Sequence, residues 1–177
     1  KKENEVKKES QKKIKNILAI CWGMQVAVTA AGGEVKKANN SHIGIANEIT
    51  INDKGLSHPL YKNKKKIFNS PAFNFDEVVK LPNKGVCLAS NKINKIQSLH
   101  FEVGETKVWG LQYHPEITYE KMINLIEFRK DRLIENRKAF KNNKEVENHI
   151  SFIKDEISVS DKELRMLELK NWLESIK

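Results

Sequence analysis

Residues 17–31 constrain the fold most, because an apolar run of strand length passes without a linker into a segment of helix formers. Residues 16–20 have the side chains of a β-strand, and residues 24–31 lead to the pair Gly32-Gly33, which is typical of a helix end. Cys21 lies at the junction of the two segments. The sequence therefore predicts a strand that turns sharply into a helix, with a cysteine at the turn.

Composition places the chain among ordinary globular proteins. Of its 177 residues, 39% are hydrophobic and 31% charged, which argues against a collagen, a disulfide-rich scaffold or a disordered chain. The most apolar stretch, residues 17–31, is too short to cross a bilayer. Cys21 and Cys87 lie in different apolar runs, so we expect a reducing, cytoplasmic setting and no membrane association.

The excess of basic over acidic residues does not by itself identify a binding partner. Lys and Arg number 32 against 23 Asp and Glu, giving a net charge of +9. The lysine-rich runs at 1–15 and 62–66 contain no aromatic side chain on which bases could stack. A solvated lysine-rich face is the favoured interpretation, with a nucleic-acid surface as the less favoured alternative.

The hydrophobic pattern predicts strands in the middle of the chain and helices at both ends. Gly104-Glu105 is typical of a hairpin loop, Asp53-Lys54-Gly55 of a turn, and Asp76 and Glu77 are expected in a loop. The expected strands are 16–20, 42–51, 86–89, 96–101 and 108–113; the expected helices are 1–13, 24–31, 122–133, 146–153 and 164–173, the last capped by Ser160 with Glu163.

These elements predict an α/β fold with a helical C-terminal extension. We divide the chain into a domain at residues 1–135 and an extension at residues 136–177. The three tryptophans, Trp22, Trp109 and Trp172, are expected to pack in the interior. The histidines share no metal-ligand spacing, so the sequence predicts neither a metal site nor a cofactor.

Cys21 is the first candidate for chemistry. A nucleophile at a strand-to-helix turn has a strained backbone, and the small residues Ala19 and Gly23 on either side suit such a turn. The turn also directs the sulfur toward a helix N-terminus, whose N–H groups favour the thiolate. The alternative is that Cys21 is a small hydrophobic core residue.

His114 and Glu116 form the second candidate. His114 follows the apolar run 108–113, at the strand end where open α/β sheets assemble their sites. Residues i and i+2 of an extended segment point to the same side, so the Glu116 carboxylate can reach the imidazole. This is the base-and-orienter part of a catalytic triad, although His-Pro-Glu alone can also be a structural coincidence.

Taken together, the two motifs resemble the class I, triad-type glutamine amidotransferases. Ile20-Cys21-Trp22-Gly23-Met24-Gln25 matches that family's Cys-x-Gly-x-Gln pattern, and Trp109-Gly110-Leu111-Gln112-Tyr113-His114-Pro115-Glu116 matches its Gly-x-Gln-aromatic-His-Pro-Glu pattern. Leu81-Pro82, Leu88-Ala89-Ser90 and Ile96-Gln97 look like the subgroup related to the amidotransferase domain of GMP synthase. The resemblance covers roughly residues 17–127.

The resemblance implies a role for each matching residue. Cys21 would attack the carboxamide of glutamine, His114 would transfer protons, and Glu116 would orient His114. The backbone N–H of Trp22 would donate to the oxyanion, and Gln25 would help to hold the substrate.

The resemblance also implies a flavodoxin-like, doubly wound sheet. This sequence departs from the family's pattern at three places. Ala19 stands where the family usually has Gly, and Asn74 replaces a usual His of a His-x-Asp-x-Val pattern. The βα units that precede the cysteine strand in the family, including a loop that donates the second oxyanion N–H, are not in the sequence. We therefore expect an N-terminally truncated amidotransferase domain.

The expected function is a stand-alone, GMP synthase-like glutaminase that hydrolyses glutamine to glutamate and ammonia, with a synthetase or other ammonia acceptor as its partner. A γ-glutamyl hydrolase or γ-glutamyl-amide hydrolase of the same fold is the first alternative. The second is a non-catalytic remnant that serves as a binding module.

Overall fold

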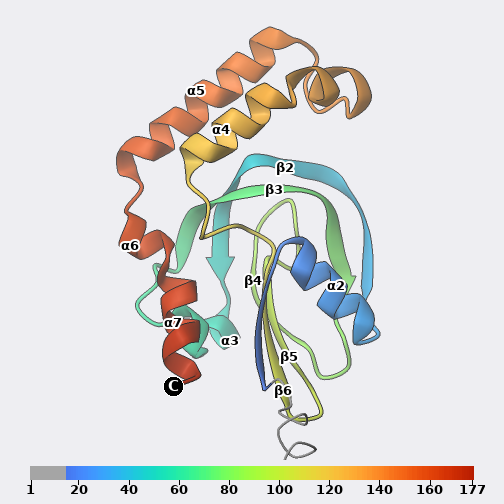
Figure 1. Cartoon of the computed structure of the whole chain (residues 1–177), viewed down its shortest axis with the longest axis vertical. Helices are drawn as coiled ribbons and strands as arrows, with labels where there is room; N and C mark the ends of the chain where they lie inside the picture. Colours follow the sequence, from blue (N-terminus) through green and yellow to red (C-terminus); the bar gives the residue numbers. More distant parts are fainter. Residues whose placement is uncertain (1–14) are drawn as a thin grey trace, which may run out of the picture.

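The computed structural model describes residues 15–177, which form one sheet with helices packed on both sides (Figure 1). The strands are β1 (Asn16–Ile20), β2 (Glu34–Ile51), β3 (Ile67–Lys80), β4 (Val86–Ser90), β5 (Ser98–Val103) and β6 (Thr106–Leu111). The helices are α2 (Trp22–Ala30), α3 (Asp53–Leu56), the 3-10 helix η1 (Pro59–Tyr61), α4 (Tyr119–Phe128), the π-helix η2 (Arg132–Asn136), α5 (Asn143–Val159), α6 (Lys162–Arg165) and α7 (Leu167–Ser175). The helix expected at residues 1–13 lies outside the described residues.

The strands are ordered β1-β6-β5-β4-β2-β3. β1 pairs with β6 in parallel, from Asn16 opposite Lys107 to Ile20 opposite Leu111, and the other neighbouring strands pair antiparallel. The predicted hairpin between β5 and β6 turns at Gly104-Glu105. The α/β fold class predicted from the sequence is confirmed.

Alternate residues of β6 face the two sides of the sheet, as a period of two requires. Val108 packs in a core cluster with Met24 and Val28 of α2, whereas Trp109 joins the opposite cluster, against which Trp172 of α7 packs. A Cβ at Gly110 would lie 2.6 Å from Cγ of Met24, so glycine lets α2 rest directly on β6. β6 is therefore covered by α2 on one face, and on the other its Trp109 packs edge-on against His58, with ring centroids 4.7 Å apart.

Strands β2 and β3 are long and curl over one end of the sheet, where α4 and α5 cover them (Figure 1). Three register shifts interrupt their pairing and allow the bend. Ile43 of β2, Ile126 of α4 and Ile153 of α5 belong to one buried cluster. The C-terminal extension thus shares a core with the sheet, and the division at residue 135 remains a prediction.

Strand β3 was not predicted from the sequence. Asp76 and Glu77 were expected in a loop, but they lie in this strand, opposite Lys37 and Lys36 of β2. β3 is the last strand of the sheet, and an edge strand tolerates both Pro71 and polar side chains. The hydrophobic pattern of β3 is weak for this reason.

The segment after Pro115 is helical as expected, but two of the expected helices are divided: 122–133 spans α4 and η2, and 164–173 spans α6 and α7. The cap of the last helical segment is Asp161 rather than Ser160: its Oδ1 accepts the N–H of Glu163 at 2.7 Å and of Leu164 at 3.2 Å. The expected turn at residues 53–55 is the short helix α3. Of the helices in residues 15–177, none is both long and apolar enough for a bilayer.

Candidate active site

Cys21 lies at a strained turn between β1 and α2, as predicted. Its backbone has φ 52° and ψ −112°, a combination that is costly for any residue other than glycine. The Cys21 N–H donates to the carbonyl of Leu111 at 2.6 Å, which holds the turn against the end of β6. The N–H of Trp22 is in the first turn of α2, where amides have no acceptor within the helix.

His114 and Glu116 lie in the loop that follows β6. Nδ1 of His114 is 2.7 Å from Oε1 of Glu116, and the two side chains are 18% and 32% exposed. The His114 N–H donates to the carbonyl of Pro71 at 2.7 Å. The geometry expected for an i, i+2 pair is therefore present, with Nδ1 of the imidazole facing the carboxylate.

The structure joins this pair to Cys21. Burial by itself lowers the pKa of His114, but hydrogen bonds with the Cys21 side chain and with the Glu116 carboxylate outweigh that effect and raise the pKa to about 9. His114 thus interacts with the Cys21 side chain on one side and with the Glu116 carboxylate on the other, and both interactions favour its protonated form. The chain brings together three residues that are up to 95 positions apart, 116 − 21.

The backbone of β3 accepts hydrogen bonds from three candidate site residues, Cys21, Gln25 and His114. The carbonyl of Pro71 accepts the N–H of His114, and the carbonyl of Phe73 accepts from Sγ of Cys21 at 3.9 Å. The carbonyl of Asp76 accepts Nε2 of Gln25 at 3.0 Å. A sequence pattern of side chains could not reveal these contacts, because they are made by main-chain oxygens.

Gln112 connects two of the predicted residues and was given no role from the sequence. Its Nε2 lies 3.6 Å from Sγ of Cys21, and its Oε1 accepts Nε2 of Gln25 at 3.1 Å. Both glutamines are buried. Gln112 belongs to the Gly-x-Gln-aromatic-His-Pro-Glu motif, so the signal was present in the sequence.

The surface beside the elbow is open. The side chain of Trp22 is 74% exposed, so the expectation that it packs in the interior is wrong, whereas Trp109 is buried as expected. A Cβ built at Gly23 would meet no atom within 4 Å. Packing therefore does not require a small residue at Gly23.

Asn74 stands where the family that the motifs resemble usually has His. Its side chain is buried. Its Nδ2 donates to the carbonyl of Asp76 at 3.0 Å and to Oδ1 of Asn94 at 3.2 Å, and Oδ1 of Asn74 has no partner among the described residues. Asn94 in turn donates to the carboxylate of Glu77 at 2.9 Å. Asn74 is part of a buried amide network that supports β3.

The family model for "Glutamine amidotransferase class-I" matches residues 1–130, well over half of the chain. The chain belongs to the class I glutamine amidotransferases. This confirms the family that the Cys21 and His114 motifs indicated.

Curated relatives of this amidotransferase chain include two kinds of protein. It is 36% identical over 106 residues to a gamma-glutamyl-L-1-hydroxyisopropylamide hydrolase of Pseudomonas sp, and 36% identical over 105 residues to a glutamine-hydrolysing GMP synthase of Borrelia garinii subsp. bavariensis. The matches cover 58% and 59% of this chain, but 36% of the hydrolase and 19% of the synthase. The chain thus spans well under two thirds of the length of these relatives.

Solved structures with the same fold include a glutamine amidotransferase of Thermotoga maritima. It superposes with a TM-score of 0.62 at 20% identity, over 98% of this chain and 65% of the other. A GMP synthase component of Thermoplasma acidophilum, described as putative, matches with a TM-score of 0.53 at 19% identity, over 72% and 67% of the two chains. At these identities the likeness concerns the fold, including the helices of the C-terminal extension in the first case.

Proposed function

We propose that this chain hydrolyses the side-chain carboxamide of glutamine to glutamate and ammonia with a Cys21–His114–Glu116 triad. The observation that carries the proposal is the placement of His114, which lies 2.7 Å from the Glu116 carboxylate and whose pKa is raised by the Cys21 side chain at a strained elbow. An inert core cysteine would need neither the elbow nor a histidine with a raised pKa. The triad also argues against the non-catalytic alternative.

In the first half of the reaction, His114 accepts the proton of the Cys21 thiol, and the sulfur attacks the carboxamide carbon of glutamine. The carbonyl oxygen becomes an oxyanion, which the N–H of Trp22 stabilises. The His114 imidazolium then protonates the nitrogen, the C–N bond breaks, and ammonia leaves. The product is a γ-glutamyl thioester on Cys21 and a neutral His114.

In the second half, His114 accepts a proton from a water molecule that attacks the thioester carbon. The C–S bond breaks, glutamate leaves, and His114 returns the proton to the sulfur, which restores the Cys21 thiol and the neutral imidazole. Glu116 holds the ring with Nδ1 toward the carboxylate and stabilises the imidazolium in both halves. One water is consumed, and one glutamate and one ammonia are formed.

Gln25 is proposed to hold the substrate through its carboxamide oxygen. Its nitrogen is already occupied by the carbonyl of Asp76 and by Oε1 of Gln112. The oxygen of Gln25 is the atom left to accept the ammonium group of the substrate. Gln112 fixes the carboxamide of Gln25 and lies next to the Cys21 sulfur, so it links substrate binding to the nucleophile.

The ammonia acceptor is proposed to be a synthetase, and the location the cytoplasm. The GMP synthase relatives support a synthetase as partner, since the name of each describes glutamine hydrolysis together with GMP synthesis.

A γ-glutamyl-amide hydrolase is the second candidate function, and one observation favours it. The Pseudomonas hydrolase is as similar to this chain, at 36% identity, as the Borrelia synthase is. The same triad would form the same thioester from a γ-glutamyl amide, with an amine leaving instead of ammonia. Only the pocket for the leaving group would differ.

One experiment tests the proposal and separates the two candidates. The 177-residue chain is incubated with glutamine or with a γ-glutamyl isopropylamide, and glutamate release is measured for the wild type, Cys21→Ala and Cys87→Ala. We expect glutamate from glutamine in the wild type and Cys87→Ala, and none above background in Cys21→Ala.

Hydroxylamine added to the same reactions should trap the thioester as γ-glutamyl hydroxamate. Faster turnover of the amide than of glutamine would favour the second candidate. Equal activity of Cys21→Ala and the wild type, on either substrate, would overturn the triad.

A further inference from the structure

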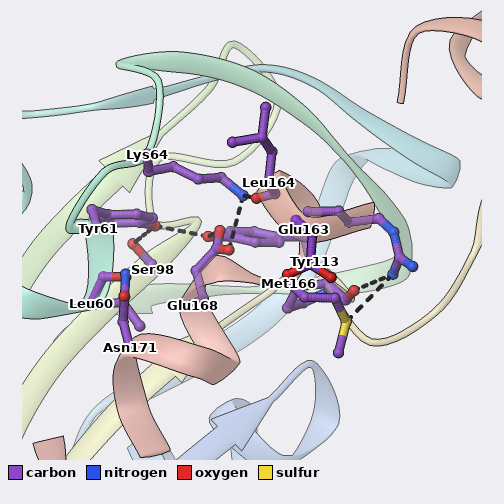
Figure 2. A network of polar contacts seen from close by, with 12 residues as sticks. Leu60, Tyr61, Lys64, Ser98, Tyr113, Glu163, Leu164, Met166, Glu168 and Asn171 are labelled. Atoms are coloured by element: carbon purple, nitrogen blue, oxygen red, sulfur yellow. Dashed lines mark hydrogen bonds and ion pairs between the residues drawn. The ribbon is translucent and has the colours of Figure 1, made fainter. Parts of the chain in front are cut away.

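Helix α7 contacts the residue that directly precedes His114 (Figure 2). Glu168, the second residue of α7, is fully buried, and its Oε1 accepts the hydroxyl of Tyr113 at 2.7 Å. Asn171, one turn later, donates to the carbonyls of Leu60 and Lys62 at 2.9 Å each, which fixes α7 on the body of the protein. The hydroxyl of Tyr113 is thus held by a helix that lies 55 residues further along the chain.

Helix α6 contacts the same loop on the other side of His114. Arg165, the last residue of α6, donates from Nη1 to the carbonyl of Pro115 and, at 2.8 Å, to the carbonyl of Ile117. These two carbonyls flank Glu116. The side chains of Glu168 and Arg165 therefore hold the loop before the histidine and around the glutamate.

The loop has few main-chain bonds of its own. Between β6 and α4, the N–H of His114 donates to Pro71 and the N–H of Ile117 donates back to His114 at 3.2 Å. The second bond closes a β-turn with Pro115 and Glu116 at its centre. Arg165 binds the carbonyls of Pro115 and Ile117 in this turn and so holds the turn against α6.

The charge of Glu168 is compensated inside the protein. Nζ of Lys64 lies 2.9 Å from Oε2 of Glu168, and the two side chains are 6% and 0% exposed. The hydroxyl of Tyr61 lies 2.9 Å from that of Tyr113, which completes a row of polar groups (Figure 2). A buried ion pair contributes little net stability compared with apolar side chains of the same volume, so its stabilising effect does not account for this arrangement.

We propose that Glu168 and Arg165 are positioning residues of the active site, which hold the loop of residues 113–117 so that His114 meets both Cys21 and Glu116. The inference rests on the triad proposed above. Neither residue touches the reacting atoms, and their effect passes through Tyr113, Pro115 and Ile117. Misplacing a catalytic group by about 1 Å can cost about 100-fold in rate, so a loose loop should slow the chemical step.

The test compares variants that remove each contact without leaving a buried charge unpaired. Lys64→Met with Glu168→Leu removes the acceptor for Tyr113, whereas Lys64→Met with Glu168→Gln keeps a carboxamide oxygen for it. Arg165→Met removes both donors, and Arg165→Lys keeps one charged donor. Glu174→Gln, at an exposed position of α7, is the matched control.

Two readouts are made on each variant of the full 177-residue chain. The first is the rate at which a diazo-ketone analogue of glutamine alkylates Cys21, followed by mass spectrometry. The second is the titration midpoint of His114, followed by NMR of its ring protons. Thermal unfolding shows whether each variant is folded, and Arg165 is half-buried, so its variants test the proposal even if the double variants unfold.

We expect alkylation to slow by about 10- to 100-fold in Arg165→Met and in the leucine double variant. In these variants the titration midpoint of His114 should fall from about 9, because the Glu116 carboxylate is no longer held against the ring. Arg165→Lys and the glutamine double variant should recover part of both effects, and Glu174→Gln should match the wild type.

Unchanged alkylation and an unchanged His114 midpoint in folded Arg165→Met would overturn the proposal. Failure of the proposed function has a different signature, in which the wild type itself does not label at Cys21. In that case the His114 titration still decides whether α6 and α7 position the loop.

Discussion

The N–H of Cys21 donates to the carbonyl of Leu111 at 2.6 Å, which ties the candidate nucleophile to the last residue of β6. His114 follows three positions after Leu111. One hydrogen bond thus couples the elbow to the strand that leads to the candidate base. The separation of the two groups depends on the β1–β6 pairing rather than on any flexible connection.

Cys21 should react selectively over Cys87. Burial raises the pKa of the Cys87 thiol above its ordinary value, and its sulfur donates to the carbonyls of Ala89 and Lys95. A diazo-ketone analogue of glutamine at pH 7.5 should label Cys21 alone, as read by peptide mass spectrometry. Equal labelling of both cysteines would contradict the assignment, and Cys87→Ala is the control that should leave labelling unchanged.

His114 should matter more than Glu116 for turnover. Replacing a general base and acid typically costs about 10²–10⁴ in rate, so His114→Gln should fall close to background. Glu116→Gln keeps a side chain of similar size but loses the charge beside Nδ1, so its loss should be smaller. It should also lower the pKa of His114, which shifts the pH–rate profile to lower pH. A profile that coincides with that of the wild type would show that Glu116 does not orient the ring.

The interactions of His114 should stabilise the fold at acidic and neutral pH and not at alkaline pH. Its folded pKa is about 9, against 6.5 for an ordinary histidine, so the folded state binds the proton more tightly. The resulting stability is complete below pH 6.5 and is lost as the pH rises through 9. Urea denaturation at pH 6 and pH 9.5 should show a difference between wild type and His114→Gln that shrinks at the higher pH. A constant difference would mean that the contacts with Cys21 and Glu116 do not favour the proton.

His42 should make the protein sensitive to acid. It is 1% exposed, and burial lowers its pKa from 6.5 to about 4, against the smaller opposite effects of hydrogen bonds with Ile45 and Asn94. Between pH 6.5 and 4 the unfolded chain binds a proton that the folded protein excludes. Stability therefore decreases as the pH falls, at up to about 1.4 kcal/mol per pH unit from this group. Urea denaturation at pH 7 and pH 5 should show a smaller pH effect for His42→Gln than for the wild type, and an equal effect would contradict the assignment.

Two glycines near the site should respond in opposite ways to alanine. A methyl at Gly110 would overlap Met24 of α2 and Leu99, which should destabilise the fold by about 1–3 kcal/mol. A methyl at Gly23 meets no atom, and alanine favours the helix by up to about 1 kcal/mol, so stability should hold or rise. Glutamine hydrolysis by Gly23→Ala should nevertheless slow, because the methyl occupies space beside Cys21. Chemical denaturation and a glutaminase assay on both variants separate the two effects.

The site residues were readable from the sequence because their side chains carry the signal. Cys21 at a strand-to-helix junction and His114 two positions before Glu116 were each ambiguous alone, and became candidates because the two motifs together resemble one family. The support beneath them was not readable. β3 contributes main-chain carbonyls at Pro71, Phe73 and Asp76, and an edge strand has too little apolar periodicity to be recognised from its sequence.

The role of the C-terminal segment was equally hidden. Its helices were expected, and the expected helix cap, Ser160, lies one residue before the actual cap, Asp161. Nothing in the sequence shows that Glu168 reaches Tyr113, because the contact depends on how α7 packs on η1. From the sequence alone, a buried glutamate in an amphipathic helix cannot be distinguished from a charged residue on the solvent-facing side.

The parallel pairing of β1 with β6 has a consequence for the order in which the protein assembles. The paired residues are 91 positions apart, from Asn16 to Lys107, whereas β5 and β6 are joined by a two-residue turn. Closing so long a loop is slow compared with forming a hairpin, so we expect β1 to join a sheet that already exists. Until it does, Cys21 is an ordinary thiol on an unstructured chain, with no histidine beside it. The reactive state of the cysteine would then be one of the last features to appear during folding, which limits side reactions of the nascent chain with the electrophiles of the cell.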